Sequence, residues 1–541
     1  MGDLLAAPAE AAGGLAVYGA QAVDASAPAS TRQALVEAGV PGRLVARDRT
    51  RGGAGLGWRD AHRRSRELLP QLAELTAELA DLDHVVLAGM GGSSLAPQAI
   101  ARTTGRPLTV LDTTDPGQVR ATLADRLDRT VVVLAGKSGT TVETDCHRRA
   151  YWQAFLDSGM TEAEAGRHFV VVTDPGSPLE AVATELGAIV VPGDPEVAGR
   201  YPALTAYGLV PCALAGVAVV DLLDQAEEFA ASLESTDANP GLALGAALAA
   251  AATTGRDKVA LVGDGTGVEG LGDWVEQLLA ESTGKDGLGL LPVVVESPDS
   301  PGLTGPDLLT VSYGGALAAG DLPAPGVAPD LAVNGPLGAQ FLAWEYATVL
   351  AAGVLGVDPF DQPHLTEVEE HVEAILAEGP PTAPPSSTEG AIEVYAPPGA
   401  PADLFGALRH LLAGLGEDGY LAVTAYLDRH AEAEADRLRP LLAQVTRRPV
   451  TFGWGPRHRY ATGQYHRGGP RVGSFLQVTG TVDVDLPVPG KPYSFGELQA
   501  AQAAGDRRAL AGRERPLLRL HLTERSAGLA QLLDAVGSLR A

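Results

Sequence analysis

The chain has 541 residues, which is enough for three or four domains. Hydrophobic residues make up 45% of it and charged residues 20%, the balance of a soluble globular protein. The net charge of −27 argues against a nucleic-acid partner and against binding to anionic membranes. An anionic substrate would therefore need a local positive pocket built against the field of the whole protein.

The cysteine content and the first residues give an expectation for the cellular location of the protein. Two cysteines, Cys146 and Cys212, are too few for a disulfide framework and indicate a reducing environment. The acidic start lacks the basic region of a secretory signal. Since no apolar run approaches about 18 residues free of glycine, proline and charge, we expect a cytoplasmic protein that spans no membrane.

The first part of the chain predicts helices followed by a parallel sheet. We interpret residues 1–80 as an N-terminal helical arm, in which the stretch RRSRELLPQLAELTAELADL has helical spacing. Residues 81–240 alternate β-branched runs with helical stretches, the pattern of a parallel sheet covered on both faces. The predicted strands of this first domain are 85–89, 108–112, 130–136, 168–174 and 188–193.

Two more α/β units are predicted after residue 240. The second covers 241–378, the Pro- and Ser-rich segment 379–389 is a linker, and the third covers 390–541. The predicted fold class is therefore α/β, with two doubly wound parallel-sheet domains and a third, C-terminal α/β unit.

The first motif with chemical content is GMGGSS at 89–94, between a predicted strand and a helix. Glycines such as Gly92 let the backbone approach a ligand, and Ser93 stands where a helix start exposes unpaired N–H groups. The spacing differs from the dinucleotide fingerprint. The motif fits either an anion-binding loop or a plain Gly-rich turn.

The second motif is GKSGTT at 136–141, again directly after a predicted strand. A lysine and three hydroxyl groups suit a single phosphate monoester; the residues are Lys137, Ser138, Thr140 and Thr141. Because the carboxyl ends of parallel strands meet at one edge of a sheet, the two loops together favour a phosphate site over two unrelated turns.

Two further segments offer an arginine and a carboxylate. Arg200 in AGRYPALTAYG precedes a predicted helix, and a guanidinium suits a developing oxyanion. Glu281 ends the helix of WVEQLLAESTGK, and Gln277 lies on the same face four residues earlier. Taken singly, Arg200 fits a surface arginine, and Glu281 fits either a surface carboxylate or a general base.

Together these motifs resemble the phosphoglucose isomerase family. GMGGS and GKSGTT resemble its two phosphate loops, GRY-x-x-L-T its arginine segment, and Q-L-x-A-E-S-x-G-K the segment of its catalytic glutamate. DPFDQP at 358–363 resembles its C-terminal phosphate-contact segment and places Gln362. Residues 390–541, with FGWGPR and TGQYHRGGP, resemble the longer actinobacterial isomerases and the transaldolase–isomerase fusions.

The resemblance implies two sugar-isomerase domains, a homodimer, and isomerisation of glucose 6-phosphate to fructose 6-phosphate through a cis-enediol without metal or cofactor. It makes Glu281 the base, with Arg200 beside it and Gln362 and the two loops on the phosphate. A same-fold isomerase for another sugar phosphate, such as mannose 6-phosphate, and a sugar-phosphate sensor without turnover are the alternatives.

Two departures from the family pattern stand out. Glu369 occupies the position of a family lysine, and the segment 282–363 lacks the usual histidine. We predict that His466 opens the sugar ring; His364 and His458 are the alternatives. With only four lysines in the chain, we also hypothesise that Lys491 meets His466 on the ring-opening side of the site.

Overall fold

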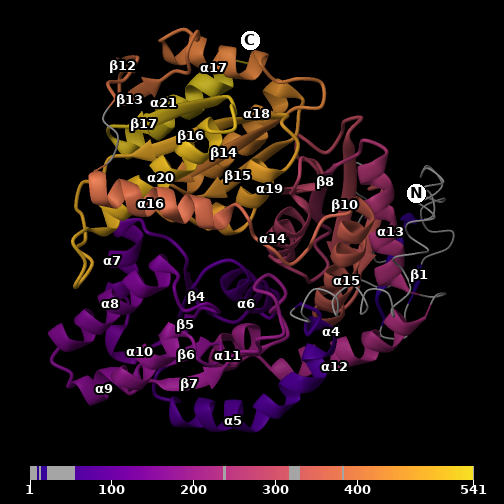
Figure 1. The fold of residues 1–541 in the computed structure, drawn as a ribbon, viewed down its shortest axis with the longest axis vertical. Helices are drawn as coiled ribbons and strands as arrows, with labels where there is room; N and C mark the ends of the chain where they lie inside the picture. Colours follow the sequence, from indigo (N-terminus) through magenta and orange to yellow (C-terminus); the bar gives the residue numbers. More distant parts are fainter. Residues whose placement is uncertain are drawn as a thin grey trace.

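The computed structural model describes residues 9–10, 14–20, 55–235, 239–315, 329–379 and 383–539. Its strands form three sheets, each built around parallel strands and flanked by helices (Figure 1). The predicted α/β class with parallel sheets is confirmed. No helix in the described ranges is both long and apolar enough to cross a bilayer.

The first sheet has five parallel strands in the order β4-β3-β5-β6-β7. They are β3 (His84–Gly89), β4 (Thr109–Leu111), β5 (Thr130–Ala135), β6 (Phe169–Thr173) and β7 (Ile189–Pro192). The helices of this part of the chain are α6 (Gly92–Thr103), α7 (Pro116–Ala124), α8 (Val142–Asp157), α9 (Glu162–Arg167), α10 (Pro178–Leu186) and α11 (Ala206–Leu214).

The neighbouring strands β3 and β5 are followed by helices α6 and α8, which lie on opposite faces of this sheet. Val85 and Leu87 share one apolar core with side chains of α6, whereas Val86 and Ala88 share another with side chains of α8. Gly89 pairs with Ala135 at the carboxyl ends of the two strands. The loops that follow β3 and β5 therefore start side by side, at the switch point where open α/β sheets bind ligands.

The second sheet has the order β1-β2-β11-β10-β8-β9. The strands β8 (Lys258–Gly263), β9 (Leu291–Val295), β10 (Leu308–Gly314) and β11 (Leu331–Asn334) are parallel. The short strands β1 (Ala9–Glu10) and β2 (Ala16–Tyr18) extend it as an antiparallel edge. Its helices are α12 (Val219–Ala230), α13 (Pro240–Thr253), α14 (Leu271–Thr283) and α15 (Leu337–Leu355).

The N-terminal arm predicted over 1–80 contributes to this second sheet. Its described helices are α4 (Trp58–Arg64), η1 (Ser65–Leu68) and α5 (Leu69–Glu78), and the remainder of the prediction lies partly outside the described residues. Helical spacing did not reveal β1 and β2, because strands of two and three residues carry almost no periodicity.

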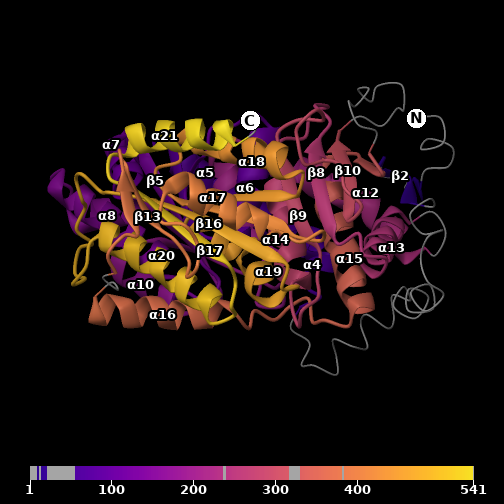
Figure 2. The ribbon, with the colours of Figure 1, turned by 90° about the horizontal axis from the view of Figure 1, so that it is seen from above.

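The third sheet has the order β12-β13-β17-β16-β14-β15. Its parallel strands are β14 (Tyr420–Tyr426), β15 (Val450–Trp454), β16 (Gly473–Gly480) and β17 (Leu517–Leu522), with β12 (Ser387–Glu389) and β13 (Ile392–Tyr395) as an antiparallel edge. The predicted linker 379–389 thus ends in β12. Figure 2 shows this sheet between α21 (Arg525–Ser538) on one face and α20 (Phe495–Ala511) on the other.

The third unit lies over the first and beside the second (Figure 1). Apolar side chains of α20 and of α16 (Leu365–Glu378) share one core with strands β3 and β5 and helix α8. At a second contact, the buried Asp112 pairs with Arg429 and Arg457 of the third unit at 2.6 Å each. The third unit is therefore joined to the first by apolar packing and by a buried ion cluster.

Candidate active site

Glu281 lies near the carboxyl end of α14, in the interior of the protein. Only 2% of its surface is exposed, so it is not the surface carboxylate that its motif alone permits. Helix α14 packs against α6 of the first unit and against the short helix α19 (Gly463–Gly468) of the third. Glu281 is thus placed where all three units meet.

Three predicted site residues, distant in sequence, converge on one oxygen of this carboxylate. Glu281 Oε2 lies 3.1 Å from Gln277 Nε2, 3.3 Å from Gln362 Nε2 and 3.3 Å from Arg200 Nε. Among the described residues, no group donates a hydrogen bond to the other oxygen, Oε1. The arrangement holds the carboxylate by one oxygen and leaves the other free to accept a proton.

Arg200 also ties the surrounding segments together. It is 1% exposed, so it is not the surface arginine that its motif alone permits. Its guanidinium donates to the carbonyls of Glu281, Pro359 and Asp361. The backbone carbonyls therefore fix the cation beside the carboxylate and hold the Gln362 segment against α14.

Burial and the neighbouring charges together shift the pKa of the Glu281 carboxylate. Burial raises the pKa of Glu281, and the Arg200 charge and the amides of Gln277 and Gln362 partly oppose that rise. Nearby Lys285 pairs with Asp361 at 2.5 Å, and burial lowers the pKa of this lysine to about 8. A carboxylate whose pKa is raised is a stronger base than an ordinary one, which suits a general base.

The glycines of GMGGSS allow the first loop to touch this cluster. Gly91 has φ +60°, and a Cβ on it would lie 2.6 Å from Gln277 Nε2. A Cβ on Gly92 would overlap the carbonyl oxygen of Gly199, next to Arg200. Ser93 follows in the first turn of α6, and within the described chain its hydroxyl has no protein partner.

Only part of the second loop faces a cavity. Gly136, Gly139, Thr140 and Thr141 line a cavity of about 600 Å³. Lys137 instead points to Asp174 at 2.5 Å and to the Asp194 carbonyl at 3.0 Å. Ser138 bonds the Thr140 hydroxyl at 2.9 Å. The two threonines therefore line the cavity, and the lysine is held by an acid.

Three other cations line the same cavity. They are Arg148, Arg459 and Lys491, the last 3.3 Å from Asp145. Glu369, at the position of the family lysine, lines it as well, and burial raises the pKa of this glutamate. Arg459 and Lys491 come from the third unit, so that unit supplies positive charge that the acidic Glu369 does not.

The three candidate histidines have different surroundings. His466 is 4% exposed, bonds the Tyr420 hydroxyl at 3.0 Å and packs on Phe475. Burial lowers its pKa well below the ordinary value. His466 is not among the residues that line the cavity with Lys491, so the proposed meeting of the two stays a prediction.

The two alternative histidines are held by charged partners. His458 lies 3.0 Å from Asp506 and is also buried. His364 is partly exposed, two residues from Gln362, and its Nδ1 lies 3.1 Å from Arg513. Of the three, His364 is the nearest in sequence to a residue that touches Glu281.

A buried polar network between the two loops was missed by the sequence analysis. Glu143 accepts hydrogen bonds from Tyr460 at 3.0 Å and Gln502 at 2.7 Å, and Arg459 lies 3.5 Å away. Tyr460 also lies against Gly91. The sequence feature that could have pointed to this network is GPRHRY, a segment with several basic residues in a strongly acidic chain.

The network lies beside both loops, because Tyr460 approaches Gly91 and Glu143 follows Thr141 by two residues. Glu281 is not among the residues lining the cavity of Thr140 and Thr141. Among the described residues, no three His, Cys, Asp or Glu side chains are grouped as a metal site would require.

Residues 75–287 match the profile of phosphoglucose isomerase. A probable glucose-6-phosphate isomerase of Haloarcula marismortui is 35% identical over 225 residues, which are 40% of this chain and 51% of the relative.

Residues 75–287 are thus similar to phosphoglucose isomerases. The matched segment contains both loops, Arg200, Gln277 and Glu281, whereas Gln362 and the third unit lie outside it. The chain spans about half the length of the curated relatives that it matches first, at 51%, 50% and 54%.

Two other relatives of phosphoglucose isomerase type cover more of the chain. The glucose-6-phosphate isomerase of Symbiobacterium thermophilum is 28% identical over 399 residues, 61% of this chain and 88% of the relative. A solved glucose-6-phosphate isomerase from Chlamydia trachomatis has 20% identity and a TM-score of 0.49, covering 59% of this chain and 75% of that one.

The close approach of the first loop generates a prediction. Gly92→Ala should force the Gly199 carbonyl away and lower the free energy of unfolding by about 1–3 kcal/mol, as overpacking does. Urea unfolding measures the loss. Gly416→Ala is the matched control, because a Cβ there meets nothing within 4 Å. Equal stability of both variants would show that the loop does not pack as described.

Proposed function

We propose that the protein interconverts glucose 6-phosphate and fructose 6-phosphate, with Glu281 as the base. The observation that carries the proposal is the convergence of Arg200, Gln277 and Gln362 on one buried carboxylate oxygen. The relatives named above are glucose-6-phosphate isomerases by name, which supports the same chemistry for this chain.

The proposed reaction uses the two carboxylate oxygens differently. Glu281 Oε1 takes the proton from C2 of the open-chain sugar and returns it to C1, while Oε2 stays bound to Gln277 and Gln362. Arg200 stabilises the charge of the intermediate cis-enediolate. Fixing the carboxylate in advance lowers the cost of orienting it during the reaction.

We propose that the phosphate group lies between the two loops. Ser93, Thr140 and Thr141 offer hydroxyl groups there, and α6 offers the N–H groups of its first turn. Arg459 and Lys491 provide the positive charge, because they line the cavity and Lys137 does not. All three cations also have acidic neighbours, at 3.5 Å, 3.3 Å and 2.5 Å respectively. These cations give the site a local positive potential, which an anionic ligand needs in a protein of net charge −27.

For ring opening we propose His364, the alternative to His466. His466 is enclosed by Tyr420 and Phe475, whereas His364 is partly exposed beside the Gln362 segment. The role predicted for His466 stays a prediction, and one kinetic experiment tests both histidines. Loss of turnover on the cyclic sugar, but not on an open-chain analogue, identifies the group that opens the ring.

We further propose the domain boundaries 81–240, 241–378 and 390–541, because each segment holds the parallel strands of one sheet. The edge strands β1 and β2 join the second domain. We also propose a homodimer, which the family resemblance supports, and a cytoplasmic location, which the composition supports.

The assignment of the base generates a direct prediction. Glu281→Gln should lower kcat for fructose 6-phosphate by about 10²–10⁴ or more, because the amide cannot accept the C2 proton. Affinity for glucose 6-phosphate, measured by calorimetry, should stay close to that of the wild type.

Glu276→Gln is the matched control, on the same helix and outside the Glu281 cluster, and it should keep its turnover. Near wild-type kcat in Glu281→Gln would reject the assignment. A wild-type protein that binds glucose 6-phosphate without turnover would favour the sensor, and turnover of mannose 6-phosphate would favour a dual isomerase.

The two-loop site generates a second prediction. Thr141→Ala should weaken binding of both glucose 6-phosphate and inorganic phosphate by about tenfold, because a hydrogen bond to a charged group is lost. Thr184→Ala, an exposed threonine of α10, is the control. Unchanged inhibition constants for phosphate in Thr141→Ala would exclude this loop from the phosphate site.

A further inference from the structure

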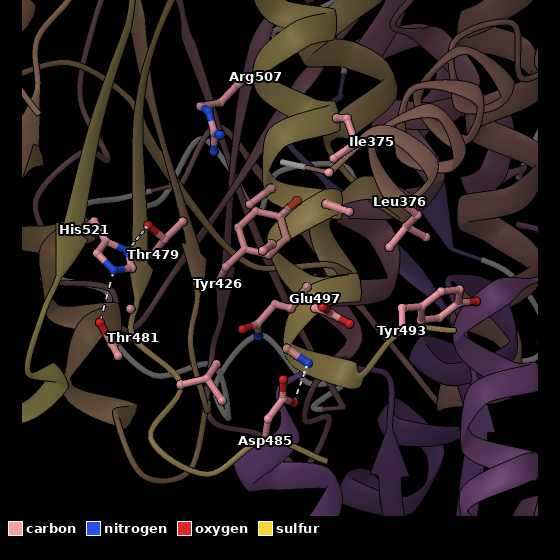
Figure 3. Close-up of a pocket in the computed structure, with 18 of the residues that line it drawn as sticks. Ile375, Leu376, Tyr426, Thr479, Thr481, Asp485, Tyr493, Glu497, Arg507 and His521 are labelled. Carbon is pink, nitrogen blue, oxygen red and sulfur yellow. Dashed lines mark hydrogen bonds between the residues drawn. The ribbon is translucent and has the colours of Figure 1, made fainter. Parts of the chain in front are cut away.

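A separate cavity of about 470 Å³ lies in the third unit, at the carboxyl ends of its parallel strands. Tyr426 ends β14, Thr479 lies at the end of β16, and His521 lies at the end of β17. Figure 3 shows these side chains around the cavity, with α20 on its other side. This edge is where open α/β sheets place their ligands, and the proposed isomerase chemistry does not use it.

Two arginines bring positive charge to this cavity. Arg507 comes from α20 and Arg519 from β17. Arg507 Nη1 donates to Gln477 Oε1 at 2.7 Å, and Arg519 stacks over the Tyr395 ring at 4.1 Å. Within the described chain neither guanidinium forms an ion pair, and the buried Nε of Arg519 lacks a hydrogen-bond partner. The charges of Glu393 and Asp506 act on Arg519 and Arg507 without forming an ion pair with either, so the two cations are only partly compensated.

The surroundings of the arginines add hydroxyl groups and a neutral histidine. His521 lies between Thr479 and Thr481, with its ring nitrogens 2.9 Å and 3.2 Å from the two hydroxyl oxygens (Figure 3). Burial and the charge of Arg519 lower the pKa of His521. Burial, followed by the like charge of Arg519, lowers the pKa of Arg507 to about 10. An anion between these groups would relieve that repulsion.

The opposite end of the cavity carries carboxylates that organise the start of α20. Asp485 accepts hydrogen bonds from the Gly496 amide at 2.8 Å and from Ser494 Oγ at 2.5 Å. Glu497 accepts one from the Ser494 amide at 2.9 Å. Figure 3 shows Asp485 and Arg507 at opposite ends of the view. The remaining acceptor capacity of Asp485 and Glu497 suits ligand hydroxyl groups rather than a second anion.

We propose that this cavity binds a small phosphorylated polyol, with its phosphate between Arg507 and Arg519 and its hydroxyl groups toward Asp485. Guanidinium groups in pairs match the several oxygens of a phosphate, and Thr479 and Thr481 supply further donors. The site is distinct from the proposed isomerase site but shares a wall with its phosphate cavity, formed by Leu376, Pro492 and Tyr493.

His521 makes the site testable without an activity assay. The full-length protein, labelled at histidine, is titrated with glycerol 3-phosphate or inorganic phosphate while the His521 ring resonance is followed by NMR; His521→Gln assigns the signal. We expect a saturable shift with a Kd of about 1 mM or tighter for glycerol 3-phosphate, and no shift with glycerol.

Substitutions separate this site from the isomerase site. Arg507→Met and Arg519→Met should each abolish the His521 shift, and Arg508→Met, an exposed arginine of the same helix, should keep it. The shift should persist in Ser93→Ala/Thr141→Ala. Absence of any shift in the wild type, an equal shift in Arg507→Met and Arg519→Met, or loss of the shift in Ser93→Ala/Thr141→Ala would overturn the proposal.

Discussion

The carboxylate of Glu281 sets the main constraint on this structure. A carboxylate that is almost fully buried is stable only if cations and hydrogen-bond donors surround it. Arg200, Gln277 and Gln362 meet that need, and they come from three separate segments of the chain. Holding those segments together accounts for the backbone contacts of Arg200 and for the glycines that let the first loop approach.

The third unit contributes residues to the surroundings of Glu281 and of the second loop. Its α19 packs against α14, where Gln464 donates to the Gly284 carbonyl at 3.1 Å. Its Arg459 and Tyr460 reach Glu143, near the second loop. The unit thereby covers the region between Glu281 and the phosphate cavity, and it introduces cations where the chain has Glu369 instead of a lysine.

Local patterns in the sequence predicted much of the fold, because long β-branched runs and helical stretches alternate. Glu281, Arg200, Gln277 and Gln362 were identified from motifs, and the structure brings them together. The orientation of Lys137 toward Asp174 was not predictable, because Asp174 follows a different strand, β6, and only the folded sheet brings the two together. The environment of His466 and the network around Glu143 likewise depend on packing between units that are far apart in sequence.

The pH dependence of kcat/KM for fructose 6-phosphate in the wild type and in Gln362→Leu tests the central claim most directly. Glu281 must be ionised to act as a base, so activity falls as the pH drops through its pKa. The Gln362 amide stabilises the ionised form, and its removal should move the acid limb upward by about one pH unit. An acid limb that stays in place or moves to lower pH would contradict the account.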